Sequence, residues 1–267
     1  MERLQTAIEK ARARRQTAPE RAASPKVDTS AAGLDAMWGG LALLDTNTAK
    51  LRKNRLVAFE SGPEAAPYDM LRTRILQQAQ KNGWRRLAVV SPHAGCGKTT
   101  TVANLIFSFS RQKDVRCIAF DLDLRRVGLG KVFDHKSKYG MADVLERRIS
   151  FAEHALRYGS NVAIGLNNGP ASNPAELLQS QQTRDVLAEI ETNYQPNLMI
   201  FDMPPLMSND DNYGFLKNVD CALIMAEADQ TTIEQIDMAE RQVAELTNVM
   251  GVVLNKCRYN EEAYGYE

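Results

Sequence analysis

The chain has 267 residues, of which 44% are hydrophobic and 25% are charged, as in an ordinary globular protein with room for one large α/β domain and modest extensions. Its 33 lysines and arginines balance its 33 aspartates and glutamates, so the bulk charge gives no reason to expect a nucleic acid as a partner. No stretch approaches the roughly 18 uninterrupted apolar residues of a membrane span, and the charged N-terminus is unlike a secretory signal.

The N-terminal region is predicted to be an extension of the main domain. Apolar residues recur at helical spacing over residues 1–11, with basic residues on the remaining faces, which indicates a short amphipathic helix. Residues 16–33 are rich in Ala, Pro, Ser and Thr and are typical of a flexible linker. We therefore assign residues 1–55 to an amphipathic helix and linker, which form either a disordered tail or a docking element for a partner.

Beyond this extension, short apolar runs alternate with longer helical patterns. The predicted strands are 87–91, 115–120, 198–201, 222–226 and 250–254. The predicted helices are 67–80, 99–111, 175–193 and 231–246, the last with Thr231 and Glu234 as a capping box. Wholly apolar strands that alternate with helices predict an α/β fold with a mostly parallel sheet and helices on both faces. In such sheets ligands bind at the carboxyl ends of the strands.

The four cysteines are spread along the chain without a C-x-x-C pair or a spacing typical of metal sites. They are Cys96, Cys117, Cys221 and Cys257. Three of them lie in or beside the strand-like runs, where cysteine usually behaves as a small buried hydrophobe. This usage indicates a reducing cytoplasm, and we expect any association with a membrane to come through a partner.

A glycine-bearing loop at residues 91–97 joins a predicted strand to a predicted helix. This arrangement points several backbone N–H groups at one spot, where phosphate binds. Lys98 is predicted to reach the β- and γ-phosphates of ATP, the Thr99 hydroxyl to bind Mg²⁺ and Thr100 to contact the α-phosphate. The strict motif has glycine where Pro92 stands, but the strand–loop–helix context supports the interpretation. The predicted nucleotide-binding residues of this P-loop are Gly95, Cys96, Gly97, Lys98, Thr99 and Thr100.

Two further strands end in acidic residues at the same edge of the predicted sheet. Asp121 and Asp123 follow one strand and point the same way if extended geometry persists. Asp202 follows another and suits a Mg²⁺ ligand, together with Thr99 and Asp121. A bare ATPase needs one such carboxylate. The additional pair indicates a proton acceptor, because a tyrosine hydroxyl that attacks phosphorus must lose its proton. The predicted catalytic residues are Lys98, Asp121, Asp123 and Asp202, with the base left open between Asp121 and Asp123.

The last residues of the chain, 258–267, form a polar tail with three tyrosines. Tyr259, Tyr264 and Tyr266 stand in a glycine-containing setting that has no need of them for a core. On its own, this tail is typical of a terminal strand or an adhesive end. Beside a phosphate site it becomes a candidate substrate, so we predict these tyrosines as phosphoacceptors.

In these features the sequence resembles the bacterial tyrosine kinases of capsule and exopolysaccharide synthesis, over about residues 60–267. The resemblance lies in the order and spacing of several motifs together. They are the Walker A loop at 91–100, the Walker A′ pattern D-x-D-x-R at 118–125, the Walker B pattern D-x-P-P at 198–205, an N-P-x-E-L-L segment at 173–178 and a G-V-V-L-N strand at 251–255. In the family that strand lies near the adenine pocket, which adds Asn255 to the predicted nucleotide-binding residues.

The resemblance implies a P-loop domain, here 56–257, related to the plasmid-partition and septum-site ATPases. It implies phosphorylation of the tail on a neighbouring subunit with ATP and Mg²⁺, and hence a homo-oligomer. It also implies activation by the cytosolic segment of a membrane chain-length-determinant protein, a polysaccharide co-polymerase. The expected location is the cytoplasm, with recruitment to the inner face of the cell membrane.

The chain departs from these families at two places. The family often carries an E-x-x-R-x-x-R helix for ring assembly, and the corresponding stretch, 66–72, keeps only Arg72. His93 stands where the partition ATPases have a signature lysine, which argues against that relative. Two other interpretations stay open: a partition- or septum-type ATPase switch, and a non-catalytic regulator that binds nucleotide to scaffold a membrane complex. Asp121, Asp123 and the tail tyrosines favour the kinase.

Overall fold

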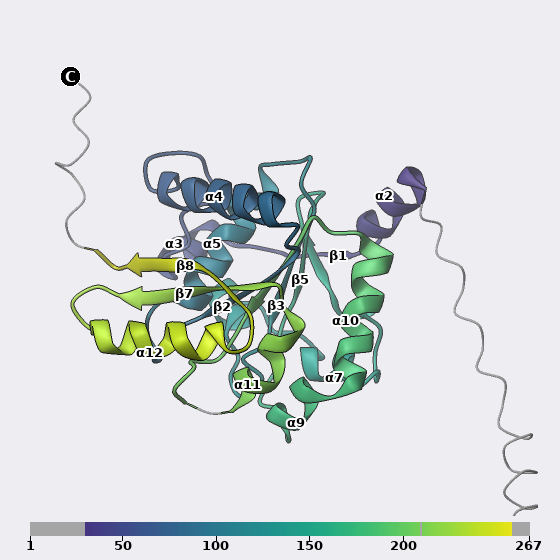
Figure 1. Cartoon of the computed structure of the whole chain (residues 1–267). Coiled ribbons are helices and arrows are strands. Elements are labelled where there is room, and N and C mark those ends of the chain that lie inside the picture. Colours follow the sequence, from purple (N-terminus) through teal and green to yellow (C-terminus); the bar gives the residue numbers. More distant parts are fainter. Residues whose placement is uncertain (1–29, 209, 258–267) are drawn as a thin grey trace, which may run out of the picture.

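The computed structural model describes residues 30–208 and 210–257, which build one eight-stranded sheet between two layers of helices (Figure 1). The strands in chain order are β1 (Ala42–Leu43), β2 (Arg86–Val90), β3 (Cys117–Asp121), β4 (Leu156–Tyr158), β5 (Val162–Gly165), β6 (Leu198–Asp202), β7 (Cys221–Glu227) and β8 (Asn248–Asn255). Across the sheet their order is β1-β4-β5-β3-β6-β2-β7-β8, and every neighbouring pair is parallel except β4 with β5.

The helices fall between the strands, as a mostly parallel sheet requires. They are α2 (Ala31–Gly39), α3 (Thr48–Lys53), α4 (Ala66–Asn82), α5 (Lys98–Ser110), α6 (Leu129–Phe133), α7 (Met141–Leu145), α8 (Phe151–His154), α9 (Pro174–Gln179), α10 (Gln181–Tyr194), α11 (Asp211–Phe215) and α12 (Ile233–Ala244). A 3-10 turn, η1 (Leu216–Asn218), follows α11. None of the helices in the described residues combines the length and the apolar character needed to cross a bilayer.

The sheet has a separate hydrophobic core on each face, because successive strand residues point to opposite sides. On one face, Ile118 and Phe120 of β3 pack with α2, α7 and α10 to α12. On the other, Cys117 and Ala119 of the same strand pack with α3 to α6. Figure 1 shows α4 and α12 on opposite sides of the sheet. The predicted α/β fold, a mostly parallel sheet covered on both faces, is therefore confirmed.

The elements predicted from periodicity are present, with two differences. The helix expected over 175–193 is two helices, because Ser180 adopts an extended conformation between them and caps α10 by accepting from Thr183 N. The capping box of α12 is one residue later than predicted: Thr232 and Gln235 form it instead of Thr231 and Glu234. The hydroxyl of Thr231 is engaged elsewhere, since it accepts a hydrogen bond from the backbone N–H of Glu227 at 2.8 Å.

Residues 30–55 are part of the packed domain, which corrects the expected boundary at residue 55. Trp38 of α2 is 2% exposed, and its indole N–H donates to the carbonyl oxygen of Tyr194 at 2.9 Å. β1 extends the sheet beside β4, and Leu51 of α3 is buried in the core that α5 shares. The linker composition at 16–33 did not reveal these large apolar anchors downstream. The amphipathic pattern over residues 1–11 and the tail at 258–267 lie outside the described residues.

Candidate active site

The loop between β2 and α5 is shaped by two glycines with left-handed backbone conformations. Gly95 has φ of 94° and Gly97 has φ of 88°, a backbone conformation that residues other than glycine rarely adopt. Gly97 immediately precedes α5, so the unpaired N–H groups of the first helical turn face the loop. A Cβ atom on Gly97 would also lie 2.2 Å from the side-chain nitrogen of Asn255. Both glycines are therefore required to bring the backbone close to an anion.

Lys98 is held inside this loop and is 7% exposed. Its ammonium donates to the Ser91 hydroxyl at 2.7 Å. Burial lowers the pKa of Lys98, and the negative charge of Asp202 opposes that change. The buried Lys98 ammonium thus donates to one hydroxyl oxygen and interacts with the Asp202 carboxylate at longer range. Its remaining N–H groups can bind an anionic ligand.

Asp121 and Asp202 lie side by side, because they are register partners at the ends of the adjacent parallel strands β3 and β6. The residues before them, Phe120 and Phe201, stack at 5.1 Å and fix the two strands together on the opposite face. Both acids are fully buried. Two carboxylates in neighbouring register positions repel each other when both are ionised.

Three of the four carboxylate oxygens of this pair have no hydrogen-bond partner among the described residues. Only Oδ2 of Asp121 is bonded, and it accepts from the backbone N–H groups of Gly128 and Leu129 at 3.1 and 2.9 Å. Native proteins seldom leave buried polar atoms unpaired, since each costs about 1–3 kcal/mol. The unpaired oxygens therefore mark a place for a ligand.

Burial dominates the electrostatics of the pair. It raises the pKa of Asp202 to about 6, against the opposing effects of Lys98 and the Thr99 hydroxyl, which lies close to the carboxylate. It also raises the pKa of Asp121 well above its usual range, and the charge of Asp202 adds to the increase. A cation bound between the two carboxylates would reverse both changes, because it would favour the ionised forms.

Asp123 lies on the same side of the chain as Asp121, as the sequence predicted. Leu122 and Leu124 continue into the core that contains Phe120, so the alternation persists beyond the end of β3. Asp123 is half-buried, and burial raises its pKa while Arg126 and Lys98 lower it. It is thus the most open of the three acids.

The arginine of the D-x-D-x-R pattern has a partner that the sequence did not reveal. Arg125 donates to both carboxylate oxygens of Asp211, from Nε at 2.8 Å and from a terminal nitrogen at 2.9 Å. Asp211 is fully buried at the start of α11, six residues after the proline pair Pro204-Pro205. The bidentate bond ties the loop after β3 to the segment after β6. A separation of 86 residues carries no local signal that could have predicted it.

The other predicted nucleotide-binding residues lie in or against the loop between β2 and α5. Thr99 and Thr100 are half-buried in the first turn of α5. Cys96 is buried within the loop. Asn255, at the end of β8, donates its side-chain N–H to the carbonyl oxygen of Cys96 at 2.8 Å. It therefore contacts the loop backbone directly, on the side away from Asp121.

The residues present fit the groups that the sequence predicts, ATP and Mg²⁺. The glycine loop, the helix N-terminus and Lys98 suit phosphate, since all three favour a negative charge. The unpaired oxygens of Asp121 and Asp202 with the nearby Thr99 hydroxyl are a hard-oxygen donor set, which Mg²⁺ prefers. A hollow of about 930 Å³ at the opposite, N-terminal edge of the strands, lined by Trp84 and Asn197 among others, lies away from all these groups.

Comparison with known proteins agrees with this geometry. The family model of the CobQ/CobB/MinD/ParA nucleotide binding domain matches residues 87–265, well over half of the chain. The chain is 25% identical over 230 residues to tyrosine-protein kinase YwqD of Bacillus subtilis (strain 168), covering 85% of this chain and 96% of YwqD. It is 24% identical over 221 residues to the putative tyrosine-protein kinase AmsA of Erwinia amylovora, covering 80% of this chain but only 30% of AmsA.

Solved structures show the same fold. The VpsO kinase domain superimposes with a TM-score of 0.64 at 25% identity, covering 73% of this chain and 95% of that domain. Cobyrinic acid a,c-diamide synthase from Mycobacterium smegmatis, solved with an ATP analogue and magnesium, has a TM-score of 0.54 at 17% identity, covering 64% of this chain and 72% of that one. The second likeness shows the fold alone. The relatives named as tyrosine kinases confirm the resemblance that the motifs indicated.

Proposed function

Since the chain belongs to the CobQ/CobB/MinD/ParA nucleotide-binding domain family, we propose that it is an ATP-dependent protein-tyrosine kinase that phosphorylates its own C-terminal tyrosines. The observation that carries the proposal is the set of three acids beside Lys98, at the ends of β3 and β6. Asp121 and Asp202 are buried with unpaired oxygens, and Asp123 stands more open beside them. A nucleotide switch has no need of the third acid.

Each group has a distinct role in this proposal. The loop from Gly95 to Thr100, with Lys98, binds the phosphates and orients the γ-phosphoryl group. Thr99, Asp121 and Asp202 hold Mg²⁺, which supplies charge neutralisation at the phosphate oxygens. Asn255 positions the loop through the Cys96 carbonyl, and its place at the end of β8 suits the adenine side of the site.

Asp123 is the proposed proton acceptor. Asp121 already accepts two backbone N–H groups through Oδ2, and it is buried beside Asp202 as its register partner. Asp123 is more exposed, so an incoming tyrosine hydroxyl can reach it. The raised pKa of Asp123 brings it nearer to the working pH, which favours a general base.

The proposed acceptors are Tyr259, Tyr264 and Tyr266. β8 ends at Asn255, on the same edge of the sheet as the P-loop, and Asn255 contacts the loop directly, which supports a tail substrate. We propose that the tail is phosphorylated on a neighbouring subunit of a homo-oligomer. Arg72, the one residue kept from the assembly pattern, donates to the carbonyl and hydroxyl oxygens of Ser108 at 2.8 and 3.1 Å. Because the Arg72 side chain bonds within its own chain, we propose that the homo-oligomer assembles through other surfaces.

The relatives also suggest a setting. By analogy with them, the proposed role is regulation of exopolysaccharide or capsule biosynthesis and export. The proposed activator is the cytosolic segment of a membrane chain-length-determinant or polysaccharide co-polymerase protein. The kinase would then act in the cytoplasm at the inner face of the cell membrane, with contact to the membrane only through that partner. No nucleic acid partner is proposed, because the formal net charge is zero.

An ATPase switch is the second candidate, because the matched family includes MinD and ParA in its description. Such a switch would need Lys98, Thr99 and Asp202 but no acceptor tyrosine. His93, which stands where partition ATPases have a signature lysine, counts against it.

The two functions are separated by measuring phosphotyrosine and ADP release in the same samples. The wild-type chain is compared with Lys98→Ala and with a triple Tyr→Phe variant at Tyr259, Tyr264 and Tyr266. A kinase gives phosphotyrosine in the wild type only, and the triple variant still binds nucleotide. ADP release that is equal in the wild type and the triple variant, without phosphotyrosine in either, would establish the switch.

A further inference from the structure

At the phosphate loop lies a cluster of three potential metal ligands whose side chains have no role in the proposed kinase reaction. His93 and Cys96 come from the loop itself, and Glu227 comes from the end of β7. One ligand atom of each lies within 4.8 Å of the others. Within the part of the chain that the structure describes, this is the one group of three such residues whose ligand atoms come so close.

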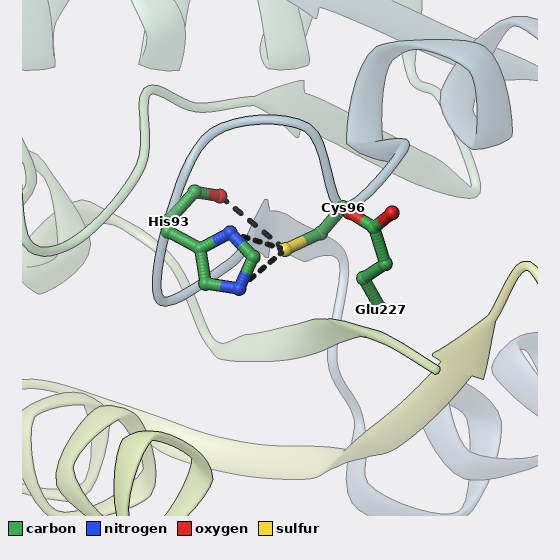
Figure 2. Close-up of side chains that lie close together, drawn as sticks. All are labelled: His93, Cys96 and Glu227. Carbon is green, nitrogen blue, oxygen red and sulfur yellow. Dashed lines mark hydrogen bonds between the residues drawn. The ribbon is translucent and has the colours of Figure 1, made fainter. Parts of the chain in front are cut away.

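The separation between His93 and Cys96 already matches a metal site. Figure 2 shows the sulfur of Cys96 pointing toward the imidazole ring of His93, and Sγ lies 3.5 Å from Nδ1 and 3.7 Å from Nε2. In a tetrahedral zinc site, with Zn–S of about 2.3 Å and Zn–N of about 2.0 Å, the sulfur and nitrogen are about 3.5 Å apart. Their separation therefore fits one shared ion. The imidazole would have to turn to bind it, because Sγ lies nearly equidistant from both ring nitrogens and away from the line between Nε2 and the Thr231 hydroxyl.

The hydrogen bonds of His93 select the nitrogen that would bind. Nδ1 lies 2.9 Å from the carbonyl oxygen of Ala94, which only accepts, so Nδ1 carries the proton. In a neutral ring the lone pair is then on Nε2, which accepts from the Thr231 hydroxyl at 2.9 Å. Metal-binding histidines are commonly oriented in this way, by an N–H bond from the other ring nitrogen to a backbone carbonyl. An ion at Nε2 would replace the Thr231 proton.

Glu227 completes the set from across the loop. One of its oxygens accepts from Lys256 Nζ at 2.8 Å, and the other lies 3.6 Å from the position that a Cβ atom on Gly95 would take. The carboxylate thus lies against the loop backbone. A shift of about 1 Å, within the freedom of a glutamate side chain, would bring it to the roughly 3.5 Å separation of tetrahedral ligands. The ion pair with Lys256 is the interaction that an ion would have to displace.

We propose that His93, Cys96 and Glu227 bind one thiophilic divalent cation of the Zn²⁺ class, with water as the remaining ligand. Thiolate, imidazole and carboxylate together suit zinc, whereas the all-oxygen set at Asp121 and Asp202 suits magnesium. Binding releases the proton of the Cys96 thiol to solvent, as the sulfur–metal bond replaces the S–H bond.

The ion would link the phosphate loop to β7. Cys96 is two residues from Lys98, and its carbonyl oxygen is bound by Asn255. A loop pinned to Glu227 has less freedom to adapt to phosphate, so zinc and Mg²⁺·ATP should weaken each other's binding by the same factor. The site would then make nucleotide binding responsive to zinc. This inference does not depend on whether the bound nucleotide is used for kinase or switch chemistry.

The test uses the purified full chain and Co²⁺ as a spectroscopic substitute for Zn²⁺. Cys257, which is the exposed thiol among the described cysteines, is replaced in a Cys257→Ser control. The proposal predicts one Co²⁺ per chain, with a thiolate charge-transfer band that Zn²⁺ abolishes, that Cys257→Ser retains and that Cys96→Ser lacks. No saturable binding would overturn the proposal. So would a band that survives Cys96→Ser and disappears in Cys257→Ser.

A second pair of variants tests the carboxylate without touching the loop. Glu227→Gln should weaken Zn²⁺ binding at least about tenfold, whereas Asp229→Asn, at an exposed acid two residues away, should not. The affinity for a non-hydrolysable Mg²⁺·ATP analogue, measured with and without Zn²⁺, gives the coupling. Wild-type affinity should fall when Zn²⁺ is present, and Glu227→Gln should lose this effect. Equal Zn²⁺ affinities in the two variants would remove Glu227 from the site and contradict the proposal.

Discussion

Asn104 in α5 and Asp202 at the end of β6 are both fully buried, yet their surroundings differ in kind. The amide of Asn104 makes four hydrogen bonds: Oδ1 accepts from Val57 and Ala58, and Nδ2 donates to the carbonyl oxygens of Arg55 and Thr100. Neither oxygen of Asp202 has a hydrogen-bond partner among the described residues. A buried polar group with all its bonds made holds the fold together.

A buried polar group that makes no hydrogen bonds instead lowers the stability of the fold, and such a group is retained to bind a ligand. The region around Asn104 attaches the segment before α4 to the P-loop helix. The region around Asp202 provides the site. This difference predicts that substitutions around Asn104 lower stability and spare activity, whereas substitutions around Asp202 lower activity and spare stability.

The largest effect is expected at Asp202. Asp202→Asn keeps the volume but removes the charge that would hold Mg²⁺, so phosphorylation activity should fall about 10²- to 10³-fold. Stability at neutral pH should be higher, because the cost of burying the ionised Asp202 carboxylate outweighs its interactions with Lys98 and the Thr99 hydroxyl. Initial rates and urea unfolding of the same preparations measure both. A variant that loses stability and activity together would contradict the assignment.

Asn104→Ala should do the opposite. Loss of four buried hydrogen bonds leaves backbone groups unpaired and should lower the free energy of unfolding by about 3–4 kcal/mol. Activity per folded molecule should remain near that of the wild type. The matched control is Asn82→Ala at the exposed end of α4, where the change should stay within about 0.5 kcal/mol. Equal effects at the two asparagines would show that the Asn104 network is not structural.

The pH dependence of stability sharpens the contrast. Burial raises the pKa of Asp202 in the folded protein to about 6, from about 3.9 in an unfolded chain, so the folded protein binds the proton more tightly. This group should therefore cost about 3 kcal/mol above pH 6, and the cost should disappear as the pH falls toward 4. Urea unfolding without Mg²⁺ or nucleotide measures it. The stability advantage of Asp202→Asn over wild type should shrink between pH 7.5 and pH 5, and a constant advantage would refute the account.

A smaller effect is expected at the Arg125–Asp211 contact, which joins the loop after β3 to the segment after β6. Arg125→Lys keeps the charge but loses the bidentate geometry toward Asp211, so stability should fall by about 1–2 kcal/mol. Activity should fall as well, because Arg125 is two residues from Asp123. The matched control is Arg147→Lys, whose partner Glu189 is exposed and whose loss should be nearly neutral. A neutral Arg125→Lys would show that the bond does not position Asp123.

Much of the site could be predicted because its signals are local. Asp121 and Asp202 each end an apolar strand, and Lys98 begins the helix that follows the glycine loop after another. Parallel strands bring these ends to one edge. The alternation through Leu122 and Leu124 is also local, and it keeps Asp123 on the same side of the chain as Asp121. The strand ends and the helix N-terminus need only a few neighbouring residues to be recognised.

What could not be predicted depends on contacts between distant residues. The Trp38 bond to Tyr194 spans 156 positions, and composition alone made residues 30–55 resemble a linker. The Arg125 bond to Asp211 and the approach of Glu227 to Cys96 likewise need the folded sheet. At α12, Thr231 and Thr232 are equivalent in sequence, and only the bond from Glu227 N to Thr231 decides which of them caps the helix.

The central claim, transfer of phosphate to the chain's own tail, is tested most directly by mapping phosphates on the purified full chain by mass spectrometry. The chain is incubated with Mg²⁺·ATP, alone and with the cytosolic segment of a candidate membrane partner, and Lys98→Ala serves as the control. The account predicts phosphate on Tyr259, Tyr264 or Tyr266 that is absent from the control. ATP hydrolysis with an unmodified tail in both conditions would contradict it and leave a nucleotide switch.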